Sequence, residues 1–265
     1  MSSNAPAMQP ATLPKSESFL RAGWRAAKKF PPVGSAWGLL RGSYFGVRKF
    51  REQISYAPGH REIRRQHWTK LQLGAGDNVL QGWLNTDLRP RRRVLAIDVT
   101  RTFPLPSGQF HYVLSEHMIE HLTFAEGRGM LSEIHRVLAD GGKVRLSTPD
   151  FDFLMGLFRP QLRDEEQAFI NWHVNTYSPG LPVHPLTVTN TMFRSWGHKH
   201  LYNEQTLSQL LRECGFGQIT RFQTGESNDP ELRDLEFHGR LVGQEVFNRI
   251  HTLVLEATKV PAPRR

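Results

Sequence analysis

Residues 71–76 read Leu-Gln-Leu-Gly-Ala-Gly, an apolar run with strand character that ends in a glycine turn. Glycine has no Cβ, so the backbone N–H groups of such a turn can come close to a ligand. Two further apolar runs, at 83–87 and 94–98, each end in a carboxylate, Asp87 and Asp98. A glycine turn followed by acids at successive strand ends is typical of an open α/β sheet that holds a nucleoside-bearing ligand at its carboxyl edge.

The spacing of this region excludes one class of ligand and raises one difficulty. The dinucleotide-binding pattern requires a third glycine at position 79, where the chain has Val79, so a nicotinamide or flavin site is disfavoured. The links between the three runs are shorter than the dozen or more residues that a parallel crossover usually needs. Either the crossover helices are reduced to single turns or one of the three strands is wrongly predicted.

A second group of motifs follows a predicted strand at 110–115. The strand leads into Glu-His-Met-Ile-Glu-His-Leu at 116–122, and Thr123 with Glu126 then forms a capping box that opens a helix. Apolar residues recur along this helix at a period near 3.6. We expect Gly141 and Gly142 to end the helix and residues 143–148 to form the fifth strand.

The motifs LxLGxG, GWxNxDL and EHxxEHL occur in this order, and over about residues 70–258 the chain resembles the class I S-adenosylmethionine-dependent methyltransferases. The resemblance implies an α/β fold with a doubly wound, Rossmann-like, mostly parallel seven-stranded sheet. It also implies shortened early crossover helices and a lid insertion after the fifth strand.

S-adenosylmethionine is the cofactor that the resemblance implies, with Asp87 on the ribose hydroxyls and Asp98 on the adenine amino group. His117 and His121 are the candidate catalytic residues, as bases for a hydroxyl acceptor. The cofactor contacts that the resemblance assigns are Gly74, Ala75, Gly76, Asp87, Leu88, Asp98, Val99, Ser115 and Glu116.

Residues 117–121 also fit His-x-x-Glu-His, an inverted zinc-peptidase pattern. A peptidase needs both histidines on one long helix, whereas Thr123 restarts a helix here, so proteolysis is disfavoured. Some quinone O-methyltransferases bind a divalent metal through a related Glu-x-x-Glu-His stretch. This chain has His117 where those enzymes have the first glutamate. A buried, structural role for His121 also remains open, and the sequence assigns no metal ligands.

A long segment, residues 151–202, precedes the next predicted helix and is rich in aromatic residues and histidines. Such an insertion is typical of a lid or substrate wall. Its histidines could transfer protons, or its aromatic residues could simply pack the lid. The segment includes Trp172, His173, Tyr177, Trp196 and His198. After it, Asn203 caps a helix whose apolar stripe includes Cys214, which argues against a cysteine nucleophile.

The net charge of +9 lies in the N-terminal segment. Residues 1–66 contain 12 Lys or Arg and 3 Asp or Glu, whereas residues 67–265 contain 22 of each. We therefore expect a basic, partly disordered arm at 1–66 and a methyltransferase domain at 67–265. Aromatic and basic residues alternate at 19–50, and this fits a helical extension packed on the domain, contact with a membrane surface, or nucleic-acid binding.

No stretch approaches the ~20 apolar residues of a spanning helix, and no secretory signal is apparent. The expected location is cytoplasmic, with membrane association through the arm. The expected activity is methyl transfer to a small molecule, a sugar or a lipid-linked intermediate. A catalytically inactive binding module is the second hypothesis and a nucleic-acid methyltransferase the third, disfavoured because the domain itself is neutral.

Overall fold

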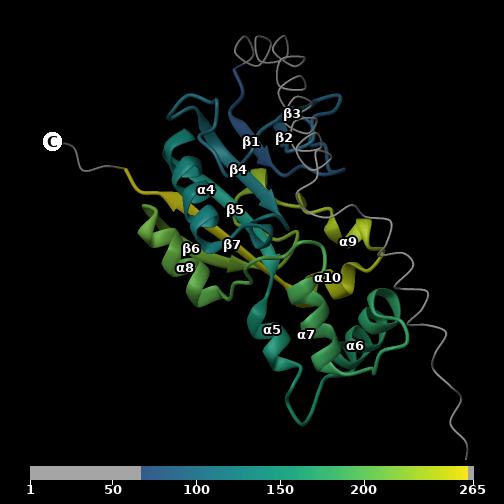
Figure 1. Ribbon diagram of the computed structural model, residues 1–265. Helices are drawn as coiled ribbons and strands as arrows, with labels where there is room; N and C mark the ends of the chain where they lie inside the picture. Colours follow the sequence, from purple (N-terminus) through teal and green to yellow (C-terminus); the bar gives the residue numbers. More distant parts are fainter. Residues whose placement is uncertain (1–66, 262–265) are drawn as a thin grey trace, which may run out of the picture. The chain divides into compact units, whose positions relative to one another are not determined.

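Residues 67–261 are described by the computed structural model, and they form a seven-stranded sheet of order β3-β2-β1-β4-β5-β7-β6 (Figure 1). Strands β1 to β5 are parallel, and β7 runs antiparallel to both β5 and β6. This confirms the predicted Rossmann-like, mostly parallel sheet. The strands are β1 (Lys70–Leu73), β2 (Leu84–Asp87), β3 (Val94–Ala96), β4 (Phe110–Glu116), β5 (Leu138–Pro149), β6 (Phe216–Phe222) and β7 (Thr252–Lys259).

The two early crossovers are indeed short. Residues 74–83 and 88–93 contain turns but no helix, yet β1, β2 and β3 still pair in parallel. The Asn85 side chain explains how the first link stays compact. Its Oδ1 accepts from Leu80 N at 2.9 Å, and its Nδ2 donates to Leu80 O at 2.9 Å, so one buried amide replaces the packing of a helix.

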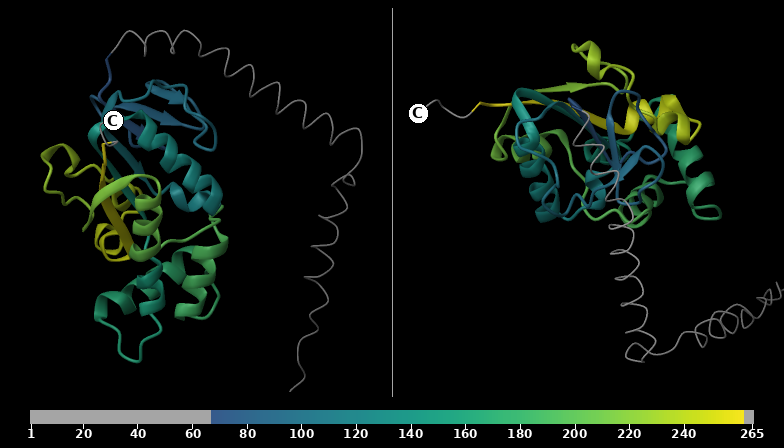
Figure 2. Two further views of the ribbon diagram at one scale, coloured as in Figure 1. Left: turned by 90° about the vertical axis from the view of Figure 1, so that its left-hand side faces the viewer. Right: turned by 90° about the horizontal axis from the view of Figure 1, so that it is seen from above.

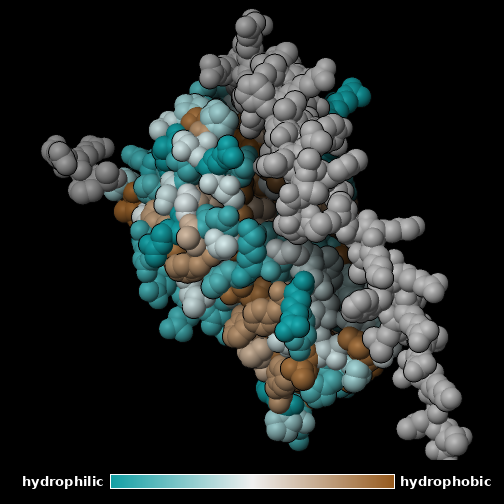
Figure 3. All heavy atoms as spheres, in the orientation of Figure 1, coloured by the Kyte–Doolittle hydropathy of each residue, from teal (hydrophilic) through white to brown (hydrophobic). Residues whose placement is uncertain are grey.

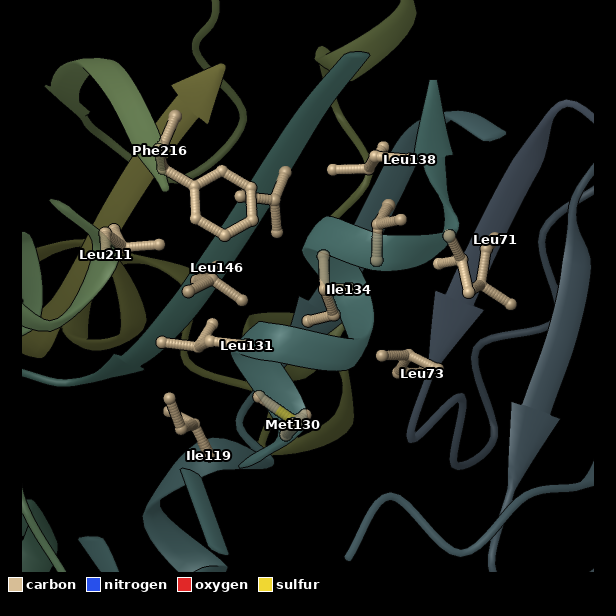
Figure 4. Packing of buried hydrophobic residues seen from close by; sticks show 14 of the residues in the cluster. Leu71, Leu73, Ile119, Met130, Leu131, Ile134, Leu138, Leu146, Leu211 and Phe216 are labelled. Atoms are coloured by element: carbon tan, nitrogen blue, oxygen red, sulfur yellow. The ribbon is translucent and has the colours of Figure 1, made fainter. Parts of the chain in front are cut away.

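Helix α4 (Phe124–Val137) begins at the predicted capping box. Its buried stripe packs on the sheet, and Figure 4 shows Met130, Leu131 and Ile134 between the side chains of β1 and Leu146 of β5. The predicted end of this helix is wrong, because it stops at Val137 and β5 begins at once.

The reason for the early end is long-range pairing. Leu138 has extended backbone angles and pairs with Phe110 of β4. Gly142 does not end a helix. A Cβ there would lie 2.9 Å from the Ala139 carbonyl oxygen in β5 itself and 3.0 Å from the Phe110 carbonyl oxygen of β4.

Two layers cover the sheet (Figure 2). Helix α8 (Glu204–Glu213), capped by Asn203 as predicted, shares the main core cluster with α4. Cys214 lies partly buried against that cluster, and burial raises its thiol pKa. The opposite face is covered by the segment that contains η2 (Pro230–Leu232), α9 (His238–Leu241) and α10 (Glu245–His251).

The insertion after β5 is helical, with α5 (Phe151–Gly156), α6 (Asp164–Tyr177) and α7 (Pro185–Arg194). These helices gather beyond the carboxyl ends of the parallel strands (Figure 1) and have an apolar cluster of their own. We call residues 151–202 the lid. Within 67–261 no helix has the length and apolar character needed to cross a membrane. The predictions for the arm at 1–66 lie outside the described residues.

Candidate functional site

The glycine turn and the end of β2 are joined by hydrogen bonds. Gly74 and Gly76 have φ angles of 67° and 48°. Gly76 N donates to Asp87 Oδ2 at 3.0 Å, Arg89 N donates to Asp87 Oδ1 at 2.9 Å, and Ala75 N donates to the carbonyl of residue 86 at 2.8 Å. The Asp87 carboxylate is therefore held in a fixed orientation beside the turn.

The end of β3 lies beside Asp87, because Ile97 N donates to the Asp87 carbonyl at 3.0 Å. The Asp98 carboxylate accepts from Thr100 N at 3.1 Å and from Thr100 Oγ1 at 2.6 Å. The fold thus brings the glycine turn and both predicted acids to one edge of the sheet. Of the two hydrophobic neighbours predicted to contact a cofactor, Leu88 is exposed and Val99 packs against the core.

Gly74 is also restricted by its neighbours. A Cβ at this position would lie 2.7 Å from Met118 Cγ, well inside an ordinary contact. The loop after β4 therefore rests directly on the glycine turn. The positive φ and this close approach both require glycine.

The last residues of β4 lie at the same edge. The Ser115 hydroxyl is buried and has no hydrogen-bond partner among the described residues. Glu116 accepts from the backbone N–H groups of Phe237 and His238, each at 2.8 Å. Burial raises the pKa of Glu116, and these two hydrogen bonds oppose the rise. Glu116 thus anchors α9 to the sheet, and its role toward a cofactor stays a prediction.

Arg145 of β5 fixes the segment before α9 from the other side. Its side chain is fully buried, with Nε 2.5 Å from Glu236 Oε1 and Nη1 2.5 Å from Glu256 Oε1. Nη1 also donates to the Glu226 carbonyl at 2.8 Å. The buried guanidinium thus joins Glu226 and Glu236, before α9, to β5 and to Glu256 of β7.

A cavity of about 350 Å³ lies between the lid and the ends of β4 and β5. His117 borders it and has a φ of 42°, an unusual backbone angle that is frequent at functional sites. The described residues that line the cavity include no lysine or arginine. Most of them are histidines or aromatic residues, namely His117, His121, Phe169, Trp172, His173, Tyr177, Trp196, His198, His238 and His251. Glu120 also lines the cavity.

Four histidines of this cavity are uncharged. Burial, strengthened by neighbouring imidazoles, lowers the pKa of His117, His238 and His251 to about 3, and burial lowers that of His173 to about 4. At neutral pH these rings are neutral. They can therefore donate and accept hydrogen bonds or bind a metal, but they cannot attract an anion by charge.

Glu120 is the acid of this cavity and is only 1% exposed. Its Oε1 lies 3.2 Å from His117 Nδ1, and its Oε2 accepts from Thr148 Oγ1 at 3.1 Å. Burial raises the pKa of the Glu120 carboxyl. The predicted catalytic residues His117 and His121 both lie here, next to the edge that holds Asp87.

Two residues of this cavity, His238 and His251, were not predicted. They lie in a stretch without a recognisable motif. Glu116 holds the start of α9 at His238, and β7, which follows His251, pairs antiparallel with β5. His173 and His198 were noted only as part of the lid.

Comparison with known proteins gives a family. Residues 43–220 match the family described as a methyltransferase domain. No curated protein matches the chain in sequence.

Several solved structures have a similar fold. An S-adenosylmethionine-dependent methyltransferase from Archaeoglobus fulgidus is 14% identical, with a TM-score of 0.42 over 82% of this chain and 99% of that one. One from Mesorhizobium loti is 16% identical, with a TM-score of 0.41 over 77% and 97%. Phosphoethanolamine N-methyltransferase 2 of Haemonchus contortus, in complex with S-adenosylmethionine, is 14% identical, with a TM-score of 0.39 over 72% and 48%. The chain thus spans about half the length of that enzyme.

Proposed function

The chain belongs to the family of methyltransferase domains, and on that premise we propose that it methylates an uncharged small molecule bound in the histidine-lined cavity. S-adenosylmethionine is the cofactor, and when bound it supplies a methyl group activated by a positively charged sulfur. One observation carries the proposal. Glu116 ends β4 at the cofactor edge, and the next residue, His117, already borders the cavity.

The residues at the edge fit this cofactor. Each Asp87 oxygen accepts one backbone N–H, so both keep acceptor capacity for the ribose hydroxyls. The Gln72 Oε1 atom, just before the glycine turn, is buried and has no partner among residues 67–261. An unpaired buried carbonyl costs about 1–3 kcal/mol, and a donor from the cofactor would satisfy it.

The cavity indicates the kind of acceptor. Its volume of about 350 Å³ is within the range for small-molecule sites. Aromatic walls such as Phe169, Trp172 and Trp196 suit an apolar body, and the imidazoles suit a hydroxyl or amine. Without a cation in the described lining, a phosphate or carboxylate on the acceptor would stay uncompensated there.

A hydroxyl acceptor must lose a proton as the methyl group arrives. The pKa of about 3 makes His117 a weak proton acceptor, because a general base works best with a pKa near the working pH. We therefore assign proton removal to His121, which lines the same cavity. Its ring lies edge-on to that of His198, with the centroids 4.9 Å apart.

The lid surface would also suit an uncharged acceptor that carries a lipid chain. Figure 3 shows hydrophobic residues gathered at the lower end of the described part, over α5 and α7. Large exposed side chains of the lid include Met155, Phe158, Leu181, Val183, Leu186, Phe193 and Trp196. An exposed apolar surface beside a substrate cavity could receive the chain of such an acceptor from a membrane.

Calorimetry with S-adenosylmethionine tests the cofactor site. Asp87→Ala removes the charged acceptor and should weaken binding about 10–100-fold, as expected for the loss of about 1.5–3 kcal/mol. Asp77→Ala is the matched control, because Asp77 lies in the same turn but is exposed and paired with Arg91. Equal effects of the two substitutions, or no binding by the unaltered chain, would refute the site.

Turnover is then measured as S-adenosylhomocysteine released with extracted neutral metabolites and with extracted lipids. Product from either fraction supports the enzyme and distinguishes the two acceptor sources. Cofactor binding without any product would instead support a catalytically inactive binding module.

A further inference from the structure

Three imidazoles converge in the cavity from separate elements. His117 follows β4, His238 begins α9, and His251 ends α10. One ring nitrogen of each lies within 4.8 Å of a nitrogen of each of the other two. The rings of His117 and His238 are stacked with centroids 4.0 Å apart, and those of His117 and His251 lie 6.0 Å apart.

Two of the three rings keep a nitrogen that makes no hydrogen bond with the described residues. His251 Nδ1 lies 2.6 Å from the Phe247 carbonyl oxygen, which can only accept, so Nδ1 carries the proton and Nε2 keeps its lone pair. No residue within 67–261 forms a hydrogen bond with the ring nitrogens of His238, whose backbone N–H is held by Glu116. Both ring nitrogens of His117 have a contact, Nδ1 with Glu120 Oε1 at 3.2 Å and Nε2 with Thr252 Oγ1 at 3.3 Å, so a metal ion on Nε2 would displace the contact to Thr252.

Buried polar atoms normally have partners. His173, in the same cavity and only 2% exposed, has two ring nitrogens without a partner among the described residues. The cavity therefore suits a bound metal ion or ligand that accepts an electron pair or a hydrogen bond from an imidazole.

We propose that His117, His238 and His251 bind one divalent transition-metal ion, with Zn²⁺ as the preferred ion. Three imidazoles and one open position are a common set for catalytic zinc, whereas Mg²⁺ and Ca²⁺ prefer oxygen ligands. The carbonyl that orients His251 is the usual outer contact of a metal-binding histidine. The sequence assigned no metal ligands, since two of the three residues lie outside its motifs.

All three ligands line the cavity, so the open position would face the space assigned to the acceptor. An oxygen of the acceptor could then occupy it, and the ion would lower the pKa of that hydroxyl. Metal binding itself does not depend on the proposed function, and it can be measured without cofactor or acceptor.

The test uses the full chain without a tag, stripped with a chelator. ZnCl₂ is titrated by calorimetry, CoCl₂ by visible absorption and MgCl₂ as the negative probe. We expect one Zn²⁺ per chain, a visible Co²⁺ band and no heat with Mg²⁺. His238→Ala should weaken Zn²⁺ binding about 100-fold, since even outer contacts are worth 10–100-fold.

His198→Ala is the matched control. Glu120, His121 and His198 form a second group of metal-binding type in the same cavity, and His198 Nδ1 likewise donates to a carbonyl, that of Met192, at 2.6 Å. We expect less than about a threefold change in this variant. Thermal melts of the metal-free variants verify the fold, and the partly exposed His238 makes this substitution milder than one at buried His251.

Two results would overturn the proposal. One is Zn²⁺ affinity in the unaltered chain no higher than in His238→Ala. The other is a loss in His198→Ala as large as that in His238→Ala, which would place the ion in the second group.

Discussion

Replacing Gly74 with alanine should destabilise the protein through two separate effects. Its φ of 67° lies in the left-handed region, where a Cβ costs about 1–2 kcal/mol. The same Cβ would lie 2.7 Å from Met118 Cγ and 3.1 Å from Met118 Cβ, and overpacking of this kind costs about 1–3 kcal/mol. We therefore expect a total loss of about 2–5 kcal/mol in the free energy of unfolding.

Gly82 separates the two effects. Its φ is 78°, but a Cβ there would meet no atom within 4 Å, so Gly82→Ala should lose only the backbone part, about 1–2 kcal/mol. Both variants are unfolded in urea without ligand and followed by far-UV circular dichroism. Met118→Ala removes Cγ but keeps Cβ, so in the Gly74→Ala background it should recover most of the steric part, whereas in the Gly82→Ala background it should cost as much as in the unaltered protein. Equal losses at the two glycines, or no coupling to Met118, would refute the contact.

Three further predictions concern the core and the cavity. Arg145→Met should lower the free energy of unfolding by about 3–5 kcal/mol, because it leaves the buried carboxylates of Glu236 and Glu256 without their cation. Arg128→Met is the control in the same urea titration and should cost less than about 1 kcal/mol, because its ion pair with Glu213 is exposed. His121→Ala should reduce turnover about 100-fold while calorimetry gives an unchanged cofactor affinity; unchanged turnover would remove this residue from proton transfer. In the metal-free protein, the free energy of unfolding should fall as the pH drops from about 6.5 to 4. In this range His173 binds a proton in the unfolded chain but not in the folded protein, where its pKa is about 4. His173→Leu should therefore reduce the slope of stability against pH by up to about 1.4 kcal/mol per pH unit.

The edge proposed for the cofactor could be predicted from the sequence because its signals are local. A glycine turn, two acids at strand ends and a capping box each depend on residues close together in the chain. In the structure β1 ends just before the turn, β2 ends at Asp87, β3 ends two residues before Asp98, and α4 begins at the capping box. The end of α4 could not be predicted in this way. Gly141 and Gly142 look like a helix stop, but the helix ends earlier because Leu138 pairs with Phe110 of β4, about thirty residues earlier in the chain.

The histidine cluster was only half visible for the same reason. His117 and His121 lie in a motif, whereas His238 and His251 have no periodicity or spacing that marks them. They reach the cavity through Glu116, which holds the start of α9, and through the pairing of β7 with β5. Contacts between residues so far apart in the chain leave no local sequence pattern, so these two histidines could be placed only once the fold was known.

The three residues that end β4 and follow it connect the parts of the site. Glu116 points to the α9 backbone, His117 to the cavity, and Met118 back to the glycine turn at Gly74. This divergence depends on the left-handed backbone of His117, at a φ of 42°. A residue with a side chain pays about 1–2 kcal/mol to adopt this left-handed angle, whereas glycine does not. The presence of histidine here, despite that cost, argues that the imidazole ring has a chemical role.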